Sequence, residues 1–258
     1  MRTVAIIPAR MGSTRFPGKP MEKILGVPMI GHVYYRTSMA NGVDLTCVAT
    51  CDRVIFDYIN GIGGYAVMTS DLHDRASDRA AEALVTIESQ KETIFDIVAM
   101  IQGDEPLLNP NDFYQAIIHL KEDPGINVVN LMGIIKNKED FLDKNIVKVV
   151  TNIKNEALYF SREPIPYECH KVNGAYVHYQ TGLIFFRHDY LLKFNSMDQT
   201  PLEIIESIDM MRILENSERV KMVTIAGENF GVDTEQDMAI VRGLMAKDLL
   251  FKKYNNRS

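Results

Sequence analysis

The sequence predicts an α/β protein with a mixed, mostly parallel sheet flanked by helices. Strand-like and helix-like segments alternate through the first half of the chain, as they do in βαβ units. The first strand-like run, residues 4–7, is apolar and β-branched, which is typical of a buried strand. It opens into a loop of glycines, hydroxyls and cations. An open α/β sheet binds its ligands at such a place, beyond the carboxyl end of a strand.

The first half of the chain contains the regular part of this pattern. The expected helices are 28–39, 54–60, 77–87 and 110–121, and the expected strands after the first are 45–50, 65–68, 94–101 and 127–132. The helix at 77–87 is rich in alanine, and the strand at 94–101 is the most apolar of the series. That strand ends at Gln102-Gly103-Asp104-Glu105-Pro106, a polar segment at the same edge of the sheet as the first loop.

The second half departs from the regular alternation. Strand-like pieces at 147–150, 158–160 and 177–186 are joined by long polar connections. We interpret residues 136–187 as an inserted β-rich arm that covers the site, makes a dimer contact, or does both. The chain then returns to a helix (201–215), a strand (220–225) and a closing helix (234–250). We expect all 258 residues to form one domain that carries this arm.

Composition excludes several classes of protein. The apolar content of 46% is that of an ordinary globular protein, and a net charge of −6 argues against sequence-independent nucleic-acid binding and against an anionic membrane surface. The cysteines at 47, 51 and 169 form no CxxC pair, which favours reduced thiols. No apolar run approaches the roughly 20 residues of a membrane helix, and no leader precedes the first strand, so we expect a cytoplasmic protein.

The loop after the first strand is the strongest functional signal. It carries Arg10, Arg15 and Lys19, and Pro17-Gly18 shapes the chain just before the lysine. Arginine can grip phosphate oxygens with two N–H groups, and lysine supplies a point charge. The alternative is a solvated surface loop with a few cations. The position after the first strand favours a polyphosphate site.

Two acidic motifs accompany this loop. Asp104-Glu105 follows the most apolar strand, and Asp233 stands at the entry to the closing helix. Each is compatible with simple helix capping, and each is also suited to a hard cation, because Mg²⁺ is usually held by one or two carboxylates plus substrate phosphates. Together with the cationic loop they form a coherent metal-assisted site.

A third segment faces the same edge of the sheet. His73, Arg75 and Ser77 lie between a strand and a helix; capping by Ser77 explains part of this segment, and the cations beyond it suggest base or phosphate contacts. Residues 61–66 match the dinucleotide fingerprint in letters only, because they follow a helix and precede a strand. We expect a helix C-cap and turn there. No Walker A sequence is present, so a dehydrogenase and a P-loop kinase are both disfavoured.

Five motifs, in order along most of the chain, carry a family resemblance. They are IIPARMGSTRFPGKP, QGDEP, ALYFSREPIPY, PLEIIE and GVDT. The sequence resembles the 3-deoxy-manno-octulosonate (KDO) cytidylyltransferases, also called CMP-KDO synthetases. The resemblance implies a Rossmann-like nucleotidyltransferase fold, a homodimer, Mg²⁺, a role in lipopolysaccharide or capsule biosynthesis, and the reaction of CTP with a sugar acid to give CMP-sugar and pyrophosphate.

The resemblance also implies roles for individual residues. Asp104 and Asp233 would hold magnesium, and Gln102 and Arg162 would face the sugar acid. The residues expected around the nucleotide are Pro8, Ala9, Arg10, Ser13, Arg15, Lys19, His73, Arg75 and Ser77. Of these, Arg10, Arg15 and Lys19, with Asp104, would act in catalysis, because charge on the pyrophosphate leaving group must be neutralised.

The sequence departs from the family pattern at three places. Arg75-Ala76 replaces a serine and glycine near the nucleobase, Gln180 replaces a sugar-contacting histidine, and Asp209-Met210 replaces a Glu-Gln pair. Gln180 and Asp209 remain expected acceptor residues. Because these changes alter the hydrogen-bonding groups of the acceptor pocket, we expect an acidic acceptor whose hydroxyl pattern can differ from that of KDO.

Other functions stay open from the sequence. One is a nucleotidyltransferase that uses another nucleotide or a different acidic or phosphorylated acceptor. Another is a nucleotide-binding regulator without turnover. The presence of Lys19 together with Asp104 and Asp233 speaks against the regulator, because a protein that only binds nucleotide needs no pair of metal carboxylates.

Overall fold

The structure, a computed structural model, describes residues 1–12, 15–167 and 177–255. The chain divides into two compact units: unit 1 is Met1–Tyr114 with Asn229–Ser258, and unit 2 is Gln115–Glu228. Both combine strands with flanking helices, and the strand pairs include parallel and antiparallel ones. The predicted α/β class is therefore confirmed.

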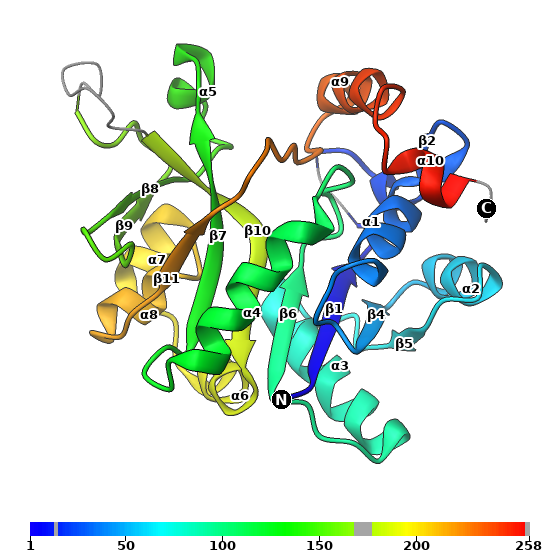
Figure 1. Ribbon diagram of the computed structural model, residues 1–258, viewed down its shortest axis with the longest axis horizontal. Helices are drawn as coiled ribbons and strands as arrows, with labels where there is room; N and C mark the ends of the chain where they lie inside the picture. The colour runs from blue at the N-terminus through cyan, green and yellow to red at the C-terminus, as the bar shows by residue number, and fades with distance from the viewer. Residues whose placement is uncertain (13–14, 168–176, 256–258) are drawn as a thin grey trace. The chain divides into compact units, whose positions relative to one another are not determined.

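Unit 1 contains four parallel strands in the order β6-β1-β4-β5 (Figure 1). Their bounds are Thr3–Ala9 for β1, Leu45–Thr50 for β4, Ala66–Met68 for β5 and Ile97–Ile101 for β6. Strand β1 lies between two neighbours, with Ile6 beside Cys47 on one side and Met100 on the other, and every residue of β1 is buried. This position explains the unbroken apolar run at the start of the sequence.

Helices surround these strands, and the C-terminal helices pack against the first one. The elements are η1 Lys19–Met21, α1 Met29–Ser38, α2 Arg53–Gly61, α3 Ala76–Lys91, η2 Pro110–Asp112, α9 Glu235–Met245 and α10 Phe251–Tyr254, with a short hairpin of β2 Lys23–Ile24 and β3 Val27–Pro28. In Figure 1 α9 and α10 lie beside β2 and α1, and buried residues of these elements form one hydrophobic cluster. Helix α2 ends at Gly61, and Gly63 follows with φ 76°, which confirms the predicted C-cap and turn.

A buried polar network ties α10 to α1. The Nε2 atom of His32 lies 2.8 Å from the carbonyl oxygen of Ile24, and Nδ1 lies 2.8 Å from the hydroxyl of Tyr254. A carbonyl oxygen only accepts, so the ring proton is assigned to Nε2 and the imidazole is neutral. Arg36 donates to the same hydroxyl and pairs with Asp248. Burial, together with the charge of Arg36, lowers the pKa of His32 to about 4.

This pKa makes stability depend on pH. The unfolded chain takes up a proton on His32 below its ordinary pKa of 6.5, whereas the folded protein does so only near 4. Stability is therefore expected to fall as the pH drops from about 6.5 to about 4, by about 3 kcal/mol in total. Urea unfolding at several pH values, compared between the wild type and His32→Asn, measures this. The variant should lose that part of the slope, and an unchanged slope would contradict the assignment.

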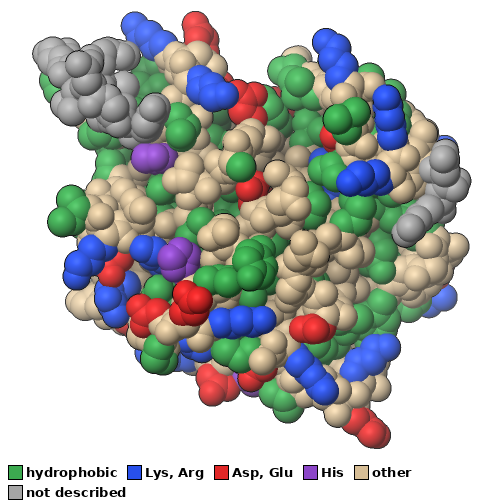
Figure 2. Space-filling model, in the orientation of Figure 1, with side chains coloured by type: hydrophobic (Ala, Val, Ile, Leu, Met, Phe, Trp, Pro, Cys, Tyr) green, Lys and Arg blue, Asp and Glu red, His purple; other side chains and the backbone are tan. Residues whose placement is uncertain are grey.

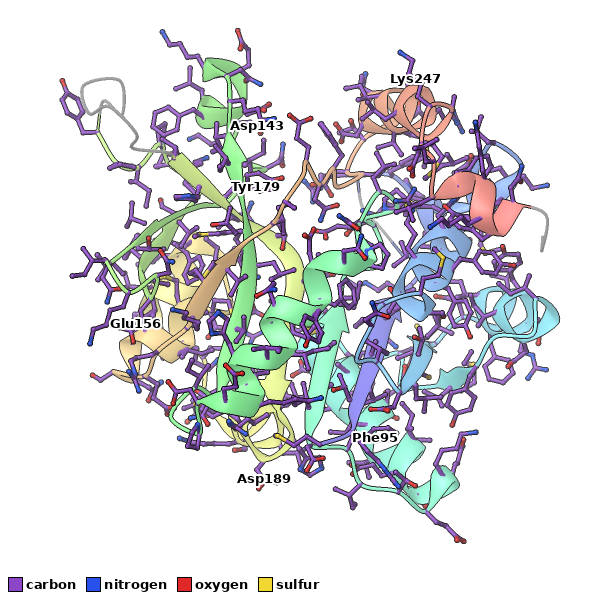
Figure 3. The ribbon with its side chains drawn as sticks, in the orientation of Figure 1. Phe95, Asp143, Glu156, Tyr179, Asp189 and Lys247 are labelled. Atoms are coloured by element: carbon purple, nitrogen blue, oxygen red, sulfur yellow. The ribbon has the colours of Figure 1, made fainter. Side chains whose placement is uncertain are left out.

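Unit 2 contains the other strands. Strand β7 (Val128–Ile135) pairs in parallel with β11 (Lys221–Thr224) and antiparallel with β10 (Val177–Arg187), while β8 (Lys148–Thr151) pairs with β10 and with β9 (Ala157–Ser161). Its helices are α5 Lys138–Leu142, α6 His188–Ser196, α7 Pro201–Glu206 and α8 Met211–Glu215. Helix α4 (Phe113–Glu122) begins in unit 1 and continues in unit 2. Strand β10 lays the ring of Tyr179 over Gly133 of β7, where a Cβ atom would overlap the ring (Figure 3).

Two predicted helices are longer than the helices in the structure. The helix expected at 201–215 is two helices, because Arg162 binds the carbonyl oxygen and carboxylate of Glu206 and Ser207 turns the chain at φ 55°. The helix expected at 234–250 ends with α9 at Met245, and α10 begins only at Phe251. The β2–β3 hairpin and the helices α5 and α6 carry too little periodic signal to be predicted. Within the described residues no helix has the length and apolarity needed to cross a membrane.

Candidate active site

The first loop begins where β1 ends and folds back on itself. Pro8 and Ala9 finish the strand in register with Ala49 and Thr50 of β4. The backbone N–H of Met11 donates to Asp52 at 2.8 Å, and that of Gly18 donates to the carbonyl of Met11 at 3.0 Å. These bonds close the loop at the carboxyl edge of the unit 1 strands. Ser13, expected at the phosphates, lies outside the described residues.

Lys19 follows this loop and points into a group of oxygens. Gly18 adopts φ 78°, a left-handed conformation that favours glycine, and Lys19 then starts η1. The Lys19 Nζ atom lies 2.8 Å from Asp104 Oδ2, 3.5 Å from Asp233 Oδ1 and 2.6 Å from the carbonyl oxygen of Val232. Arg15 donates to Asp233 Oδ1 at 2.9 Å. Lys19 therefore contacts both predicted metal carboxylates, and Arg15 contacts Asp233.

A backbone hydrogen bond links the two segments that carry the carboxylates. Asp104 follows β6 and Asp233 precedes α9, and the N–H of Val232 donates to the carbonyl of Asp104 at 2.9 Å. Asp237 accepts from the backbone N–H groups of Asp233 and Thr234 at 3.0 and 2.8 Å, in a capping box. Asp237 therefore orients Asp233 through the helix entry.

Asp104 and its neighbour Glu105 differ in their exposure to solvent. Glu105 is buried, and Asn229 donates to its carboxylate at 2.5 Å. Asp104 and Asp233 each keep about a third of their side chains exposed, at 30%. The first of the acidic pair therefore faces solvent and the second supports the loop.

This donor set fits a hard divalent cation. Two carboxylates converge on one point, which a cation, the ammonium of Lys19, occupies at 2.8 and 3.5 Å. Mg²⁺ binds oxygen ligands and commonly takes one or two carboxylates plus substrate phosphates. The described residues hold no group of three or more His, Cys, Asp or Glu that can bind a metal by itself. Asp104 and Asp233 thus form half of a site that phosphate oxygens would complete.

Gly103 sets the position of Asp104. A Cβ atom at this residue would lie 2.9 Å from the carbonyl oxygen of Pro8 and 3.3 Å from Ile30 Cδ1. The backbone of β1 cannot yield as a flexible side chain can, so Gly103→Ala must displace the loop that carries Asp104.

We expect Gly103→Ala to lower kcat by about tenfold or more, at a stability loss of about 1–3 kcal/mol. Steady-state kinetics and urea unfolding measure the two effects. Gly243→Ala is the matched control, because nothing lies within 4 Å of its added Cβ. Unchanged kinetics in Gly103→Ala would show that the loop tolerates the methyl group.

The segment containing His73 is clamped by α3. Glu82 accepts from the backbone N–H of Ser70 at 2.9 Å and contacts Nε2 of His73, and Arg79 donates to the carbonyl of Ser70 at 3.0 Å. Burial by itself would raise the pKa of Glu82, but the bonds from Ser70 and His73 outweigh it and lower that pKa. Arg10 reaches the same segment, with NH1 3.4 Å from the carbonyl of His73. The segment is thereby connected to the first loop.

The two remaining residues of this segment lie at the start of α3. Arg75 is the N-cap residue and makes no side-chain cap. Ser77 is fully buried in the first turn, so the expectation that it caps the helix is wrong. A cap must stand one position before the first turn, and Ser77 comes too late.

Two of the expected acceptor residues, Arg162 and Gln180, directly follow residues that pair with Lys148 of β8. Lys148 of β8 is in register with Tyr179 of β10 and with Ser161 of β9, so Gln180 and Arg162 come next on either side. The ammonium of Lys148 is buried and donates to three carbonyl oxygens, each at 2.7 Å, which belong to Asp143, Ile146 and Arg162. Burial lowers the pKa of Lys148.

Arg162 is largely engaged with the backbone. Its side-chain nitrogens donate to the carbonyls of Glu206 and Lys144 at 3.0 Å and to that of Ser207 at 3.3 Å. Within residues 1–12, 15–167 and 177–255, three of the five N–H groups of the guanidinium are used in this way.

The other acceptor residues have different settings. Gln102, in unit 1, directly follows β6 and is half-buried. Asp209, in unit 2, is half-buried just before α8, and Met210 is fully buried. Met210 therefore belongs to the hydrophobic core.

Sequence reasoning missed the residues that hold the site in place. Asp52 supports the first loop, and Arg79 and Glu82 support the His73 segment. The signals were present. Asp52 follows β4, the parallel neighbour of β1, and Arg79 and Glu82 are three positions apart on one helix face.

Comparison with known proteins agrees with this arrangement. A sequence profile described as "Cytidylyltransferase" matches residues 4–220. The 3-deoxy-manno-octulosonate cytidylyltransferase of Geobacter metallireducens (strain ATCC 53774 / DSM 7210 / GS-15) is 42% identical over 92% of this chain and 95% of its own. The enzyme of that name from Escherichia coli is 35% identical over 96% and 98%.

A solved structure shows the same relationship. The structure of CMP:2-keto-3-deoxy-manno-octonic acid synthetase complexed with CTP matches with a TM-score of 0.85 and 34% identity, over 96% of this chain and all of that one. A 4-diphosphocytidyl-2C-methyl-D-erythritol synthase from Anaerococcus prevotii shares the fold alone, with a TM-score of 0.63 and 16% identity. The chain thus belongs to the cytidylyltransferase family, among the 3-deoxy-manno-octulosonate cytidylyltransferases, and is an enzyme.

Proposed function

We propose that this enzyme transfers a cytidylyl group from CTP to KDO, giving CMP-KDO and pyrophosphate. The observation that carries the proposal is the group formed by Lys19, Arg15 and the carboxylates of Asp104 and Asp233 at the carboxyl edge of the unit 1 strands. A cationic loop beside two convergent carboxylates suits a nucleoside triphosphate bound with a metal ion. The relatives reported above bear the name of this activity.

The reaction needs positioning and charge neutralisation and no covalent intermediate. The anomeric hydroxyl oxygen of KDO attacks the α-phosphorus in line, the bond from that phosphorus to the β-phosphate oxygen breaks to release pyrophosphate, and the hydroxyl proton passes to solvent. Arg10, Arg15 and Lys19 would hold the phosphates and neutralise charge on the leaving pyrophosphate. Mg²⁺ held by Asp104 and Asp233 would supply Lewis-acid stabilisation of the phosphate oxygens.

The nucleoside end would lie against the end of β1. Pro8 and Ala9 border this end of the strand, and His73 and Arg75 lie in the segment clamped by Glu82 and Arg79. Because that segment is fixed by hydrogen bonds to α3, its polar groups are preorganised for a base. We propose that it recognises cytosine.

The acceptor would be recognised by Gln102, Arg162, Gln180 and Asp209. A guanidinium can bind a carboxylate, and the side chain of Arg162 is held in place by its bonds to the carbonyls of Glu206, Lys144 and Ser207. The names of the relatives favour KDO as the acceptor over another sugar acid. Residues 136–187, of which 168–176 lie outside the described residues, are proposed to cover this acceptor, to make a dimer contact, or to do both.

Two further proposals concern the oligomeric state of the enzyme and its location in the cell. We propose that it works as a homodimer, as the resemblance implies, and that it acts in the cytoplasm. On the face shown in Figure 2, basic and acidic side chains are interspersed, which suits the net charge of −6.

The test is pyrophosphate release with CTP, UTP, ATP and GTP, each against KDO and a panel of other acidic sugars, with Mg²⁺. Release with CTP and KDO alone is the expected result. Release with CTP and another acid would show that Gln180 and Met210 reshape the acceptor pocket. If no pair of nucleotide and acidic sugar releases pyrophosphate, the proposal is overturned.

A further inference from the structure

We propose that Lys19 is the counter-ion of Asp104 and Asp233 in the free enzyme, so that the divalent cation enters this site together with the nucleotide. The inference rests on the proposed function, because it assumes that the two carboxylates are the metal ligands. It adds an order of binding and a second role for the lysine.

The ammonium group of Lys19 contacts both carboxylates. An ammonium group has three N–H donors, and Nζ of Lys19 has three oxygens within 3.5 Å, which belong to Asp104, Asp233 and Val232. The side chain is only 12% exposed. Each donor therefore has an acceptor, and the lysine is held between the carboxylates rather than extended into solvent.

The second step is that the ammonium and a divalent cation exclude each other. A magnesium ion bound by both carboxylates lies about 2.0–2.1 Å from an oxygen of each. The same oxygens are 2.8 and 3.5 Å from Nζ. Two cations that share these oxygens repel strongly at such a distance, so Lys19 must leave before metal binds.

A bound nucleotide would give the Lys19 ammonium group new hydrogen-bond acceptors. The phosphates of a nucleotide offer new acceptors for its three donors, and they also supply oxygen ligands to the metal. Arg15 contacts Asp233 at 2.9 Å, but its side chain is 53% exposed, whereas that of Lys19 is 12% exposed between both carboxylates. The nucleotide therefore releases the carboxylates by attracting the lysine.

The test measures Mn²⁺ binding by electron paramagnetic resonance, without and with CTP. Without CTP, Lys19→Met is expected to bind Mn²⁺ at least about tenfold more tightly than the wild type. Lys19→Arg keeps the charge and should behave as the wild type does. The double variant Lys19→Met/Asp104→Asn should lose the gain, because one of the released carboxylates is gone.

Lys23→Met is the matched control, since it removes one positive charge from an exposed residue of unit 1 outside the site. An equal gain in Lys23→Met, or no gain in Lys19→Met, would overturn the inference. Failure of the metal site itself gives a different result, in which the wild type binds no Mn²⁺ even with CTP. Circular dichroism verifies that each variant is folded.

Discussion

Asp104→Asn is expected to lower kcat by about 100-fold or more while CTP binding survives in part. The substitution keeps the shape of the side chain and removes its charge, so Lys19 loses its 2.8 Å partner and the metal would lose one of two carboxylates. Preorganised charges at such sites contribute about 10²–10³ in rate each. The phosphate-binding cations of the first loop remain. Pyrophosphate release measures kcat, and calorimetry measures the affinity for CTP.

The control for this variant is Asp57→Asn. Asp57 lies on α2 in unit 1, is 56% exposed and pairs with Arg53 one helical turn away. The same loss of charge there should leave kcat unchanged within about twofold. If Asp104→Asn keeps full turnover, the carboxylate is not part of the metal site. If the wild type shows CTP binding without any turnover, the protein is a regulator.

Arg212→Met is expected to cost about 3–5 kcal/mol of stability, the largest effect of any single substitution proposed for this chain. Arg212 and Glu203 are 2% and 3% exposed, and the guanidinium contacts the carboxylate at 2.8 and 2.6 Å through two nitrogens. It also lies over the ring of Phe194 at 4.4 Å. Removal of the arginine leaves a buried carboxylate without its partner, and desolvation makes that state costly. Urea unfolding measures the loss.

Two comparisons separate the buried pair from surface charge in general. Arg219→Met breaks the exposed pair with Glu156, in which the arginine is 60% exposed, and should cost no more than about 1 kcal/mol. The double variant Arg212→Met/Glu203→Met leaves no isolated charge and should recover much of the loss. A cost for Arg212→Met as small as that for Arg219→Met would mean that water reaches the carboxylate of Glu203.

The sequence by itself determined the class of fold and the location of the nucleotide-binding loop. Strand β1 could be predicted because it is buried on both faces, and burial on both faces requires an unbroken apolar run. The loop from Arg10 to Lys19 could be predicted because it follows that strand. The motifs themselves identified the family, which the relatives then confirmed.

Local signals were least informative where a distant side chain ends an element. Ser207 follows α7 with φ 55°, a conformation that its own sequence does not require, and Arg162 binds the preceding carbonyl from 44 positions away. The predicted helix at 201–215 was therefore too long. The same reason applies to the Ser77 cap, because the start of α3 depends on how Arg79 and Glu82 hold the preceding segment.

Only the tertiary structure decided how the site is connected. Lys19 is 85 positions from Asp104 and 214 from Asp233, so no local pattern predicts that one ammonium group contacts both. The hydrogen bond from Val232 to Asp104 sets the spacing of the carboxylates. Hydrophobic periodicity reports which face of an element is buried, whereas the direction of a charged side chain depends on the oxygens that folding brings within reach of it.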